Sequence, residues 1–227
     1  LFDLAPVCQH STVKMKIVIL AVVCLTLSIH AQKPEPCKSP PLLEGALTVF
    51  LPSQHWRVFE KFSYDAIGQN VRVLAAGTDG NQTFLTDLLL LYREGVSYEI
   101  HYRNQTCIKQ ALKEPFRHLG VPHNAHFLSQ MVLGSSSLPG QGLLVNVWNG
   151  TWEETKSHYL MTYTEFGCIP VSIADFTQKA ELGELTSFFD LVEGIENPDV
   201  FIPPSFCDSV EVLPPRKSAS SSFIPVL

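Results

Sequence analysis

Apolar and polar residues alternate over several short segments of the chain, with the period of two that is typical of strands with one buried face. The clearest segment is 96–103, where every second position is apolar. Its apolar positions are Val96, Tyr98, Ile100 and Tyr102. A second strand-like run at 84–92 precedes it, and Glu94-Gly95 between them indicates a tight turn. The two segments are therefore predicted to form a β-hairpin.

A second hairpin is predicted around the turn residues at 65–68, which separate the apolar segments 62–64 and 71–74. Other segments have the length and composition of strands. They are 46–51, 143–148, 159–166, 171–173 and 185–192. Turn residues separate these segments at roughly the spacing of a β-sandwich or β-barrel. The pattern therefore predicts a mainly β protein.

The stretch 125–148 combines two patterns around a loop rich in Gly, Ser and Pro. Before the loop, apolar residues at i, i+1, i+4 and i+5 indicate a helical stripe, and Asn124 and Gly134 suit its two ends. A short helix is thus predicted at 124–133, with a strand as the alternative. A weaker helical signal covers 111–118. The residues after the loop predict a strand that is buried on most of both faces.

The loop itself invites two functional interpretations. Its glycines suggest a phosphate-binding loop, but the spacing is wrong and no Lys-Ser/Thr pair follows. Ser135, Ser136 and Ser137 suggest a nucleophile, but Leu138 stands where a nucleophile elbow needs glycine. A structural turn is therefore the preferred interpretation.

The segment 15–31 has the pattern of a secretory signal peptide. Met15-Lys16 opens it, an apolar run follows, and Ala31 is a small residue at the expected cleavage position. We expect residues 1–14 to be an upstream translated segment. The mature domain is expected to cover 32–207, followed by a flexible Pro- and Ser-rich tail at 208–227.

Composition limits the partners of the mature protein. The whole chain has a formal net charge of −6, and without Asp3, Lys14 and Lys16 the remainder has 14 basic and 21 acidic residues, or −7. A mildly acidic protein is not expected to bind nucleic acid or anionic membranes. No later apolar stretch approaches about 18 residues, so no transmembrane anchor is expected.

Four cysteines remain after the signal peptide. They are Cys37, Cys107, Cys168 and Cys207. In an oxidising compartment an even number implies two disulfide bonds, and four cysteines allow three connectivities. Because no C-x2-C pair occurs among them, a zinc site is not expected.

Three Asn-X-Thr sequons begin at Asn81, Asn104 and Asn149. Each lies beside a predicted turn or at a strand end, where a bulky sugar could face water. N-glycosylation is predicted at these positions, since the chain is expected to enter the secretory pathway.

No catalytic set or metal-binding motif can be assigned from sequence. The one histidine cluster comprises His118, His123 and His126. Pro122 interrupts this cluster, and its spacing matches no known metal site. Asp79, Asn81 and Asp87 lie close in sequence but do not form a calcium-binding loop. Without a Ser/His/Asp or Cys/His set, no catalytic residue is proposed, and the protein is predicted not to be an enzyme.

Several blocks, in order, resemble the ependymin family, the secreted glycoproteins of fish brain fluid and their ependymin-related relatives. The signature block is MVLGSSSLPGQGLLVNVW at 131–148. The other blocks are CKSPPLLEG at 37–45, FSYDAIGQNVRV at 62–73, LLLLYREGVSYEI at 88–100, TEFGCIPVS at 164–172 and FIPPSFC at 201–207. Together they extend over nearly the whole mature chain.

The resemblance implies several properties beyond those of the sequence patterns. It implies the disulfide pairs Cys37–Cys168 and Cys107–Cys207, bound calcium with ligands that sequence does not identify, and a homodimer. It also implies a fold similar to bacterial lipoprotein carriers. That fold is a curved antiparallel half-barrel with two short helices around a hydrophobic pocket.

Aromatic side chains on the predicted strands are the candidates for lining such a pocket. They are Phe62, Tyr64, Phe84, Tyr92, Tyr98, Tyr102, Phe166 and Phe188. An ordinary aromatic core is the alternative interpretation of the same residues.

The leading functional hypothesis is a secreted calcium-binding glycoprotein that binds a hydrophobic or lipid-like molecule and contributes to cell–matrix adhesion. Its other partners would be extracellular-matrix or cell-surface components. The alternatives are an adhesion protein with no ligand cavity and, less favoured, a hydrolase of the lysosomal lumen. A cavity would support the first hypothesis and a large exposed patch the second. Convergent ionisable groups with perturbed pKa values would support the third.

Overall fold

The structure is a computed structural model that describes residues 16–18, 34–54, 56–79, 82–153, 155–179 and 181–215. The predicted upstream segment 1–14, most of the predicted signal peptide, Asn81 and residues 216–227 lie outside the described residues. The fold belongs to the compact unit that begins at Pro36.

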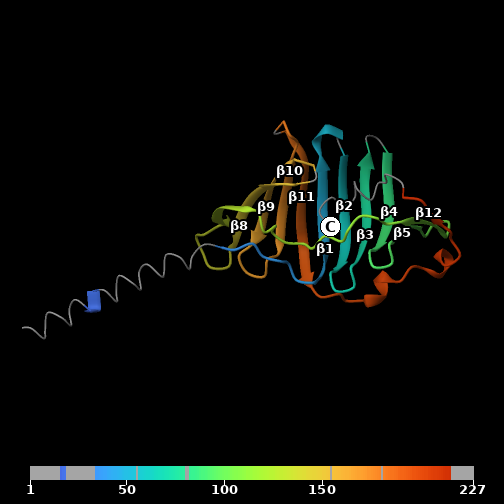
Figure 1. The fold of residues 1–227 in the computed structure, drawn as a ribbon, viewed down its shortest axis with the longest axis horizontal. Helices are drawn as coiled ribbons and strands as arrows, with labels where there is room; N and C mark the ends of the chain where they lie inside the picture. Colours follow the sequence, from blue (N-terminus) through green and yellow to red (C-terminus); the bar gives the residue numbers. More distant parts are fainter. Residues whose placement is uncertain are drawn as a thin grey trace, which may run out of the picture. The chain divides into compact units, whose positions relative to one another are not determined.

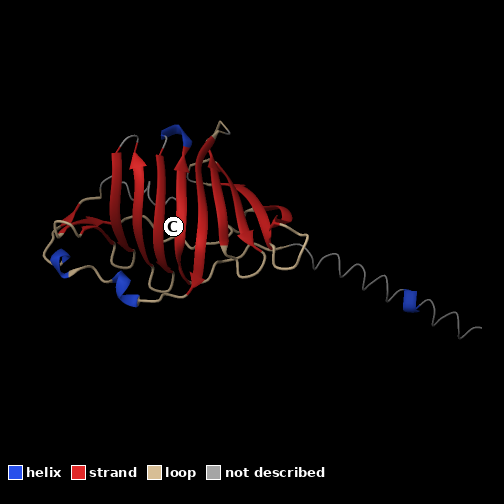
Figure 2. Ribbon diagram, turned by 180° about the vertical axis from the view of Figure 1, so that it is seen from behind, coloured by secondary structure: helices blue, strands red, loops and turns tan. Residues whose placement is uncertain are grey.

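One large sheet of twelve strands makes up the described part of this unit (Figures 1 and 2). The strands are β1 (Leu42–Leu51), β2 (Trp56–Asp65), β3 (Asn70–Asp79), β4 (Gln82–Leu91), β5 (Val96–His101), β6 (Thr106–Ala111), β7 (His126–Gly134), β8 (Gly142–Thr151), β9 (His158–Thr164), β10 (Pro170–Phe176), β11 (Leu182–Glu193) and β12 (Val212–Leu213). Their spatial order is β12-β6-β5-β4-β3-β2-β1-β11-β10-β9-β8-β7. All neighbours are antiparallel except β12, which runs parallel to β6. The predicted mainly β fold with an open, curved antiparallel sheet is confirmed.

The sheet is assembled from two runs of consecutive hairpins, β2 to β6 and β7 to β11. Strand β1 lies between them and pairs with both β2 and β11. Although β6 and β7 are consecutive in the chain, they lie on opposite sides of the sheet. The connection 112–125, called the strap here, therefore crosses one face of the sheet, and Figure 1 shows it in yellow-green in front of the strands.

Alternation along β2 explains which face is covered. Trp56, Val58, Phe62 and Tyr64 are buried, whereas the intervening side chains are more exposed. Because successive side chains of a strand point to opposite faces, these four define one apolar face, called the inner face. Its residues pack with Leu119 and Val121 of the strap in the main core.

Backbone hydrogen bonds fasten the strap to the segment before β1. The Val121 N–H donates to the Cys37 carbonyl at 2.8 Å, and the Ser39 N–H donates to the Leu119 carbonyl at 3.0 Å. The Leu119 N–H donates to the Tyr64 hydroxyl at 3.0 Å. The Cys37–Cys168 disulfide then joins this segment to the turn between β9 and β10.

A smaller core lies on the opposite, outer face of β4 and β5. Its buried members are Leu89, Leu91, Tyr98, Ile100 and Cys207, with Phe201 and Phe206 packed against them. The Cys107–Cys207 disulfide attaches the C-terminal segment there. Both disulfides thus have the pairing implied by the family resemblance. Arg72 adds a bidentate contact with Asp87 and donates to the Val200 carbonyl at 2.7 Å.

The predicted helix at 124–133 is wrong, because this segment is the edge strand β7. A register shift lies between Phe127 and Ser129. Phe127 packs its ring on Trp148 at a centroid distance of 5.3 Å, whereas Leu128, Met131 and Val132 are exposed. The helix-like spacing thus came from apolar residues on both faces of an edge hairpin rather than from one buried stripe.

The weaker helical signal at 111–118 is wrong as well. The strap has no helical residues, and Pro115 lies within it, where proline disfavours a helix interior. Phe116 instead stacks on Tyr64 at a centroid distance of 5.6 Å. The helices of the described strand-bearing unit are three single 3-10 turns, η1 (Pro52–Gln54), η2 (Pro198–Phe201) and η3 (Ser205–Cys207). Strand β12 falls inside the segment that was predicted to be a flexible tail.

Candidate functional site

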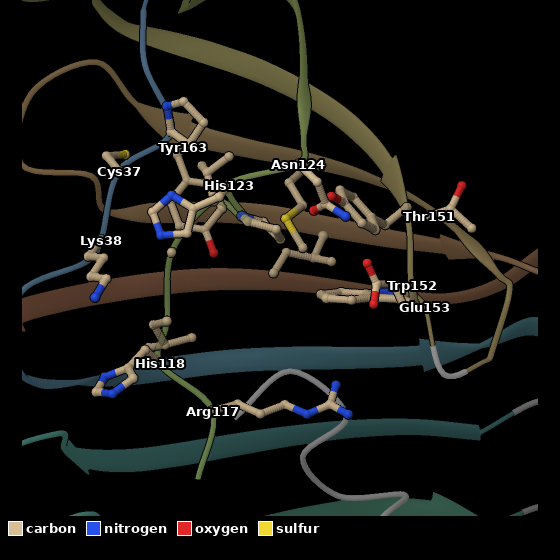
Figure 3. Close-up of a pocket in the computed structure, with 18 residues that line it drawn as sticks. Cys37, Lys38, Arg117, His118, His123, Asn124, Thr151, Trp152, Glu153 and Tyr163 are labelled. Atoms are coloured by element: carbon tan, nitrogen blue, oxygen red, sulfur yellow. The ribbon is translucent and has the colours of Figure 1, made fainter. Parts of the chain in front are cut away.

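A cavity of about 570 Å³ lies between the strap and the inner face of the sheet (Figure 3). Its walls come from the segment before β1, the strap, the start of the β8–β9 connection and strands β9 and β10. The residues that the following paragraphs use are Lys38, Arg117, His118, His123, Trp152, Glu153, Tyr159, Met161, Tyr163 and Ile173. A volume of this size is within the range of small-molecule sites, about 300 to 1,000 Å³.

The floor of the cavity is largely apolar. Tyr159, Met161 and Tyr163 alternate along β9, and Ile173 is the cross-strand partner of Met161 on β10. All four are at most 2% exposed, so the sheet holds them rigidly in the core. Burial raises the pKa of the Tyr163 phenol, which hydrogen-bonds to the backbone of Gly120. The neutral phenol thus helps to hold the strap.

The rim of the cavity is rich in basic groups. Lys38, Arg117, His118 and His123 line it, with Glu153 as the one acidic side chain among its lining residues. Figure 3 shows Lys38, His118 and His123 on one side of the cavity, with Glu153 on the other. In a chain with a net charge of −6, this is a local excess of positive charge that can attract an anionic group.

Trp152 forms the inner wall and is held from three directions. Its Nε1–H donates to Asp175 Oδ1 at 2.6 Å. Its ring lies 4.6 Å from that of Tyr159, and the Arg117 guanidinium lies 5.9 Å from its centroid. Burial raises the pKa of Asp175, while the Trp152 hydrogen bond and the charge of Arg117 act in the opposite direction. These contacts fix the shape of the wall.

Two further carboxyl groups lie behind this wall on the inner face. Glu184 is the cross-strand partner of Asp175, and burial, with a smaller effect of Asp175, raises the pKa of Glu184 to about 7. Glu60 on β2 is fully buried, and neither of its oxygens has a hydrogen-bond partner among the described residues. Burial, together with the negative charge of Glu184, raises the pKa of Glu60 to about 9. Glu60 is therefore protonated near neutral pH.

A hydrolase would need ionisable groups that have perturbed pKa values and converge in the cavity. The three carboxyl groups meet only the first of these two requirements. Their pKa values are perturbed, as catalytic groups often are. However, Glu60, Asp175 and Glu184 are not among the residues that line the cavity. A general acid or base must reach the reacting atom within hydrogen-bond distance, so the arrangement supports binding better than catalysis.

Half of the predicted pocket aromatics lie on the inner face without lining the cavity. Phe62 and Phe188 pack edge to face at a centroid distance of 6.2 Å. Phe84 stacks on Trp56 at 5.9 Å, and Tyr64 binds the strap. They form the core that supports the cavity floor.

The other four predicted aromatics need correction. Tyr92 contacts the strap through Phe116, at a centroid distance of 5.2 Å, but does not line the cavity. Tyr98 lies in the outer core, and Tyr102 is exposed and accepts a hydrogen bond from Arg72. Phe166 lies in the β9–β10 turn and is 80% exposed. Alternation places Tyr98 on one face of its strand but does not show which face the strap covers. The other three lie in turns, beyond the strands that were predicted to hold them.

Sequence reasoning also missed most of the cavity floor. Tyr159, Met161 and Tyr163 did lie in a predicted strand, and their spacing of two was a signal that they share a face. Nothing in the sequence placed the strap over that strand. Of the histidine cluster, the structure brings His118 and His123 to the cavity, whereas His126 begins β7.

The two described sequons differ in their surroundings. Asn104 is exposed between β5 and β6, and its Oδ1 accepts from the Thr106 hydroxyl at 2.8 Å. Asn149 lies within β8, and its buried Oδ1 has no hydrogen-bond partner in the described part of the chain. Glycosylation at all three sequons stays a prediction, and Asn104 offers the more accessible of these two side chains.

The calcium candidate finds no support in the geometry. Arg72 engages both carboxylate oxygens of Asp87, at 3.0 and 2.7 Å. Over the residues that the structure describes, no group of three or more His, Cys, Asp or Glu side chains could hold a metal ion. In the same residues, no helix has the length and apolar character needed to cross a membrane.

Comparison with known proteins agrees with the resemblance of the sequence blocks. A family model described as Ependymin matches residues 80–207. Ependymin-2 of Carassius auratus is 34% identical over 199 residues, which cover 88% of this chain and 91% of that protein. Ependymin of Notemigonus crysoleucas is 33% identical over the same length and the same shares.

Solved structures with a similar fold have very different sequences. An uncharacterized conserved protein from Thermus thermophilus aligns with a TM-score of 0.50 and 7% identity, over 78% of this chain and 91% of that one. At this identity the likeness concerns the fold alone.

Proposed function

Because this chain belongs to the ependymin family, we propose that it is a secreted, disulfide-bonded glycoprotein that binds an amphiphilic, lipid-like molecule without transforming it. The observation that carries the proposal is the cavity under the strap, with its apolar floor and basic rim. The apolar part of the ligand would lie on the floor formed by Met161 and Ile173. Each CH₂ group removed from water there would contribute about 0.8 kcal/mol.

The basic rim favours a ligand with an anionic headgroup. Lys38 and Arg117 come from separate segments and both line the cavity. An anionic group beside a lysine or arginine gains a charge-assisted hydrogen bond, which is stronger than one between neutral groups. The apolar floor and basic rim together match one amphiphile with a negative head.

Reversing the charge of the rim is expected to weaken binding of a long-chain fatty acid about tenfold, or about 1.4 kcal/mol. The variants are Lys38→Glu and the double variant Lys38→Glu/Arg117→Glu, because both remove attraction and add repulsion. A titration with a fluorescent fatty acid measures the dissociation constant. The matched control is Lys61→Glu, an exposed lysine on the outer face of β2, which should leave the affinity unchanged.

A fatty alcohol of the same chain length distinguishes the contribution of the basic rim from that of the apolar floor. Its affinity should be the same for the wild-type protein and the Lys38→Glu variant, because it carries no charge. If fatty acid and alcohol lose affinity equally, the rim acts through the shape of the strap and not through charge. If neither ligand shows saturable binding to the wild-type protein, the cavity is no lipid site and adhesion becomes the better hypothesis.

The outer face supports a second role in contacts with other proteins. Exposed apolar side chains lie on its central strands, from β3 to β9. They include Phe59, Leu74, Leu160 and Phe189. Extended exposed apolar surface is characteristic of interaction sites, so we include a homodimer and adhesive contacts with matrix or cell-surface components in the proposal. Secretion is the proposed destination, with the lysosomal lumen as the alternative.

Calcium binding remains a prediction from the family alone. Since the described residues show no group of three or more His, Cys, Asp or Glu side chains that could hold a metal ion, we propose attached sugars as the calcium ligands. Isothermal titration of the glycosylated protein should then show calcium binding that disappears after enzymatic removal of the sugars. Binding that survives deglycosylation would require a protein site instead.

A further inference from the structure

The β7–β8 hairpin extends beyond the rest of the sheet at its turn end. The register of β8 with β9 begins at Val145 and Thr164. The register of β8 with β7 continues to the pair Gly134 and Gly142. The part at 132–143, called the distal hairpin here, is therefore two-stranded and lies past the last residue pair with β9.

The distal hairpin exposes apolar side chains on both faces and at its turn. Val132 and Leu133 are adjacent in β7 and so point to opposite faces, yet both are exposed. Leu133 is 51% exposed, and Leu138 in the turn is 60% exposed. Leu143, the cross-strand partner of Leu133, is exposed as well. A hairpin packed on a protein core would have buried one of its faces.

The hairpin also carries no formal charge. No Asp, Glu, Lys or Arg occurs between Arg117 and Glu153. Natural edge strands commonly use charged residues to prevent association with other chains. β7 is an edge of the sheet and lacks this protection, so its surface is suited to a partner that is itself apolar and uncharged.

An apolar groove continues the patch toward the centre of the outer surface. Leu133 and Leu143 line it together with Phe166 and Phe189. Phe166 lies in the β9–β10 turn, which is beside the start of β8 because the Glu165 N–H donates to the Leu144 carbonyl at 3.0 Å. The exposed apolar residues of the hairpin thus continue into this groove.

We propose that the distal hairpin docks the protein on the surface of an electrically neutral phospholipid bilayer, with Leu138 leading into the interface. A protein partner, or a second copy, would cover the open edge or one face of the hairpin. A bilayer surrounds both faces and the turn, which matches the observed exposure. Interfacial amphipathic helices bury their apolar faces about 5–10 Å deep, a depth that a hairpin turn can also reach.

The absence of charge favours neutral over anionic lipids. Binding to anionic membranes is driven by clusters of Lys and Arg, and the distal hairpin has none. The inference goes beyond the proposed function, since docking does not require the ligand cavity on the inner face.

Flotation with phosphatidylcholine vesicles tests the docking directly. The disulfide-bonded mature protein should float with the vesicles, and Leu138→Asp and Leu133→Asp should each lower the partition coefficient about tenfold, because a charge is costly at the interface. The matched control is Leu85→Asp on β4, since Leu85 is 67% exposed but lies outside the hairpin. This variant should float like the wild-type protein. Added salt should leave flotation unchanged.

A tryptophan in place of the leading residue gives an independent readout. The fluorescence of the Leu138→Trp variant should shift to shorter wavelength with vesicles and be quenched by brominated phosphatidylcholine. The inference is overturned if the wild-type protein does not float or if Leu85→Asp lowers flotation as much as Leu138→Asp does. It is also overturned if the hairpin variants change only the mass of the protein in light scattering, because the hairpin would then contact a second copy. Fatty-acid titration of Leu138→Asp in solution tests the cavity separately, so a failure of docking is distinct from a failure of ligand binding.

Discussion

The Glu60→Gln variant is expected to be more stable than the wild-type protein by about 3 kcal/mol near pH 7, as an upper estimate. In the folded protein the pKa of Glu60 is raised to about 9 from an ordinary value of 4.5. Folding therefore takes up a proton wherever the pH lies between these two values. Glutamine has a similar shape and titrates no proton, so it removes this cost.

The raised pKa of Glu60 determines how the stability gain of Glu60→Gln changes with pH. A carboxyl group with a raised pKa lowers stability progressively as the pH rises from about 4.5 to about 9, by about 1.4 kcal/mol per pH unit. The gain of Glu60→Gln should therefore be near zero at about pH 4.5 and largest at about pH 9. Urea denaturation at several pH values measures it.

An exposed carboxyl group provides the control for this measurement. Glu181 precedes β11 and is exposed, so Glu181→Gln should give no comparable gain at any pH. A gain for Glu60→Gln that does not change with pH would mean that the pKa of Glu60 is the same in the folded and the unfolded protein. The substitution would then act through packing alone.

Loss of the Cys37–Cys168 disulfide is expected to lower the free energy of unfolding by about 4–5 kcal/mol in the chain-entropy account. The bond joins residues 131 apart. We also expect the Cys37→Ser/Cys168→Ser variant to bind a fatty acid about tenfold more weakly, or about 1.4 kcal/mol. The reason is local, because Cys37 lines the cavity and its carbonyl accepts the hydrogen bond from Val121 of the strap.

The second disulfide is the matched control. Cys107 and Cys207 are 100 residues apart, so the Cys107→Ser/Cys207→Ser variant should lose nearly the same stability, since the entropy term grows only with the logarithm of loop length. Its bond lies on the outer face, and the fatty-acid affinity should be unchanged. The fatty-acid titrations should be carried out at a temperature at which circular dichroism shows that both variants are folded. Equal losses of affinity would mean that the strap does not depend on Cys37.

The strands could be predicted from sequence because each of them carries its own signal. Val96 to Tyr102 alternate in polarity, and the structure confirms a strand over most of that segment, Val96–His101. The Glu94-Gly95 turn, where Gly95 has a φ of 66°, formed the predicted hairpin between β4 and β5. These features depend on neighbours in the chain, which a single sequence displays.

The cavity could not be predicted because it depends on contacts between distant segments. Tyr98 and Tyr163 both lie in alternating strands, but the strap covers the face of Tyr163 only. The strap itself has no periodic pattern, and Phe116 anchors it by stacking on Tyr64 of the core. Strand β7 was misinterpreted as a helix for a related reason, since its exposed apolar residues imitate the stripe of a buried helix.

The position of β1 has a consequence for the order in which the protein can fold. Most strands pair with a neighbour in sequence, but β1 also pairs with β11, and Leu43 lies opposite Glu193. Pairings between distant residues form slowly, because the intervening chain loses entropy before the contact forms. During synthesis β1 and β2 can pair early, while the other edge of β1 stays open until β11 has been made. The seam between β1 and β11, near the centre of the finished sheet, can thus close only after β11 has been made, and until then the nascent chain presents a long unpaired strand edge to its surroundings.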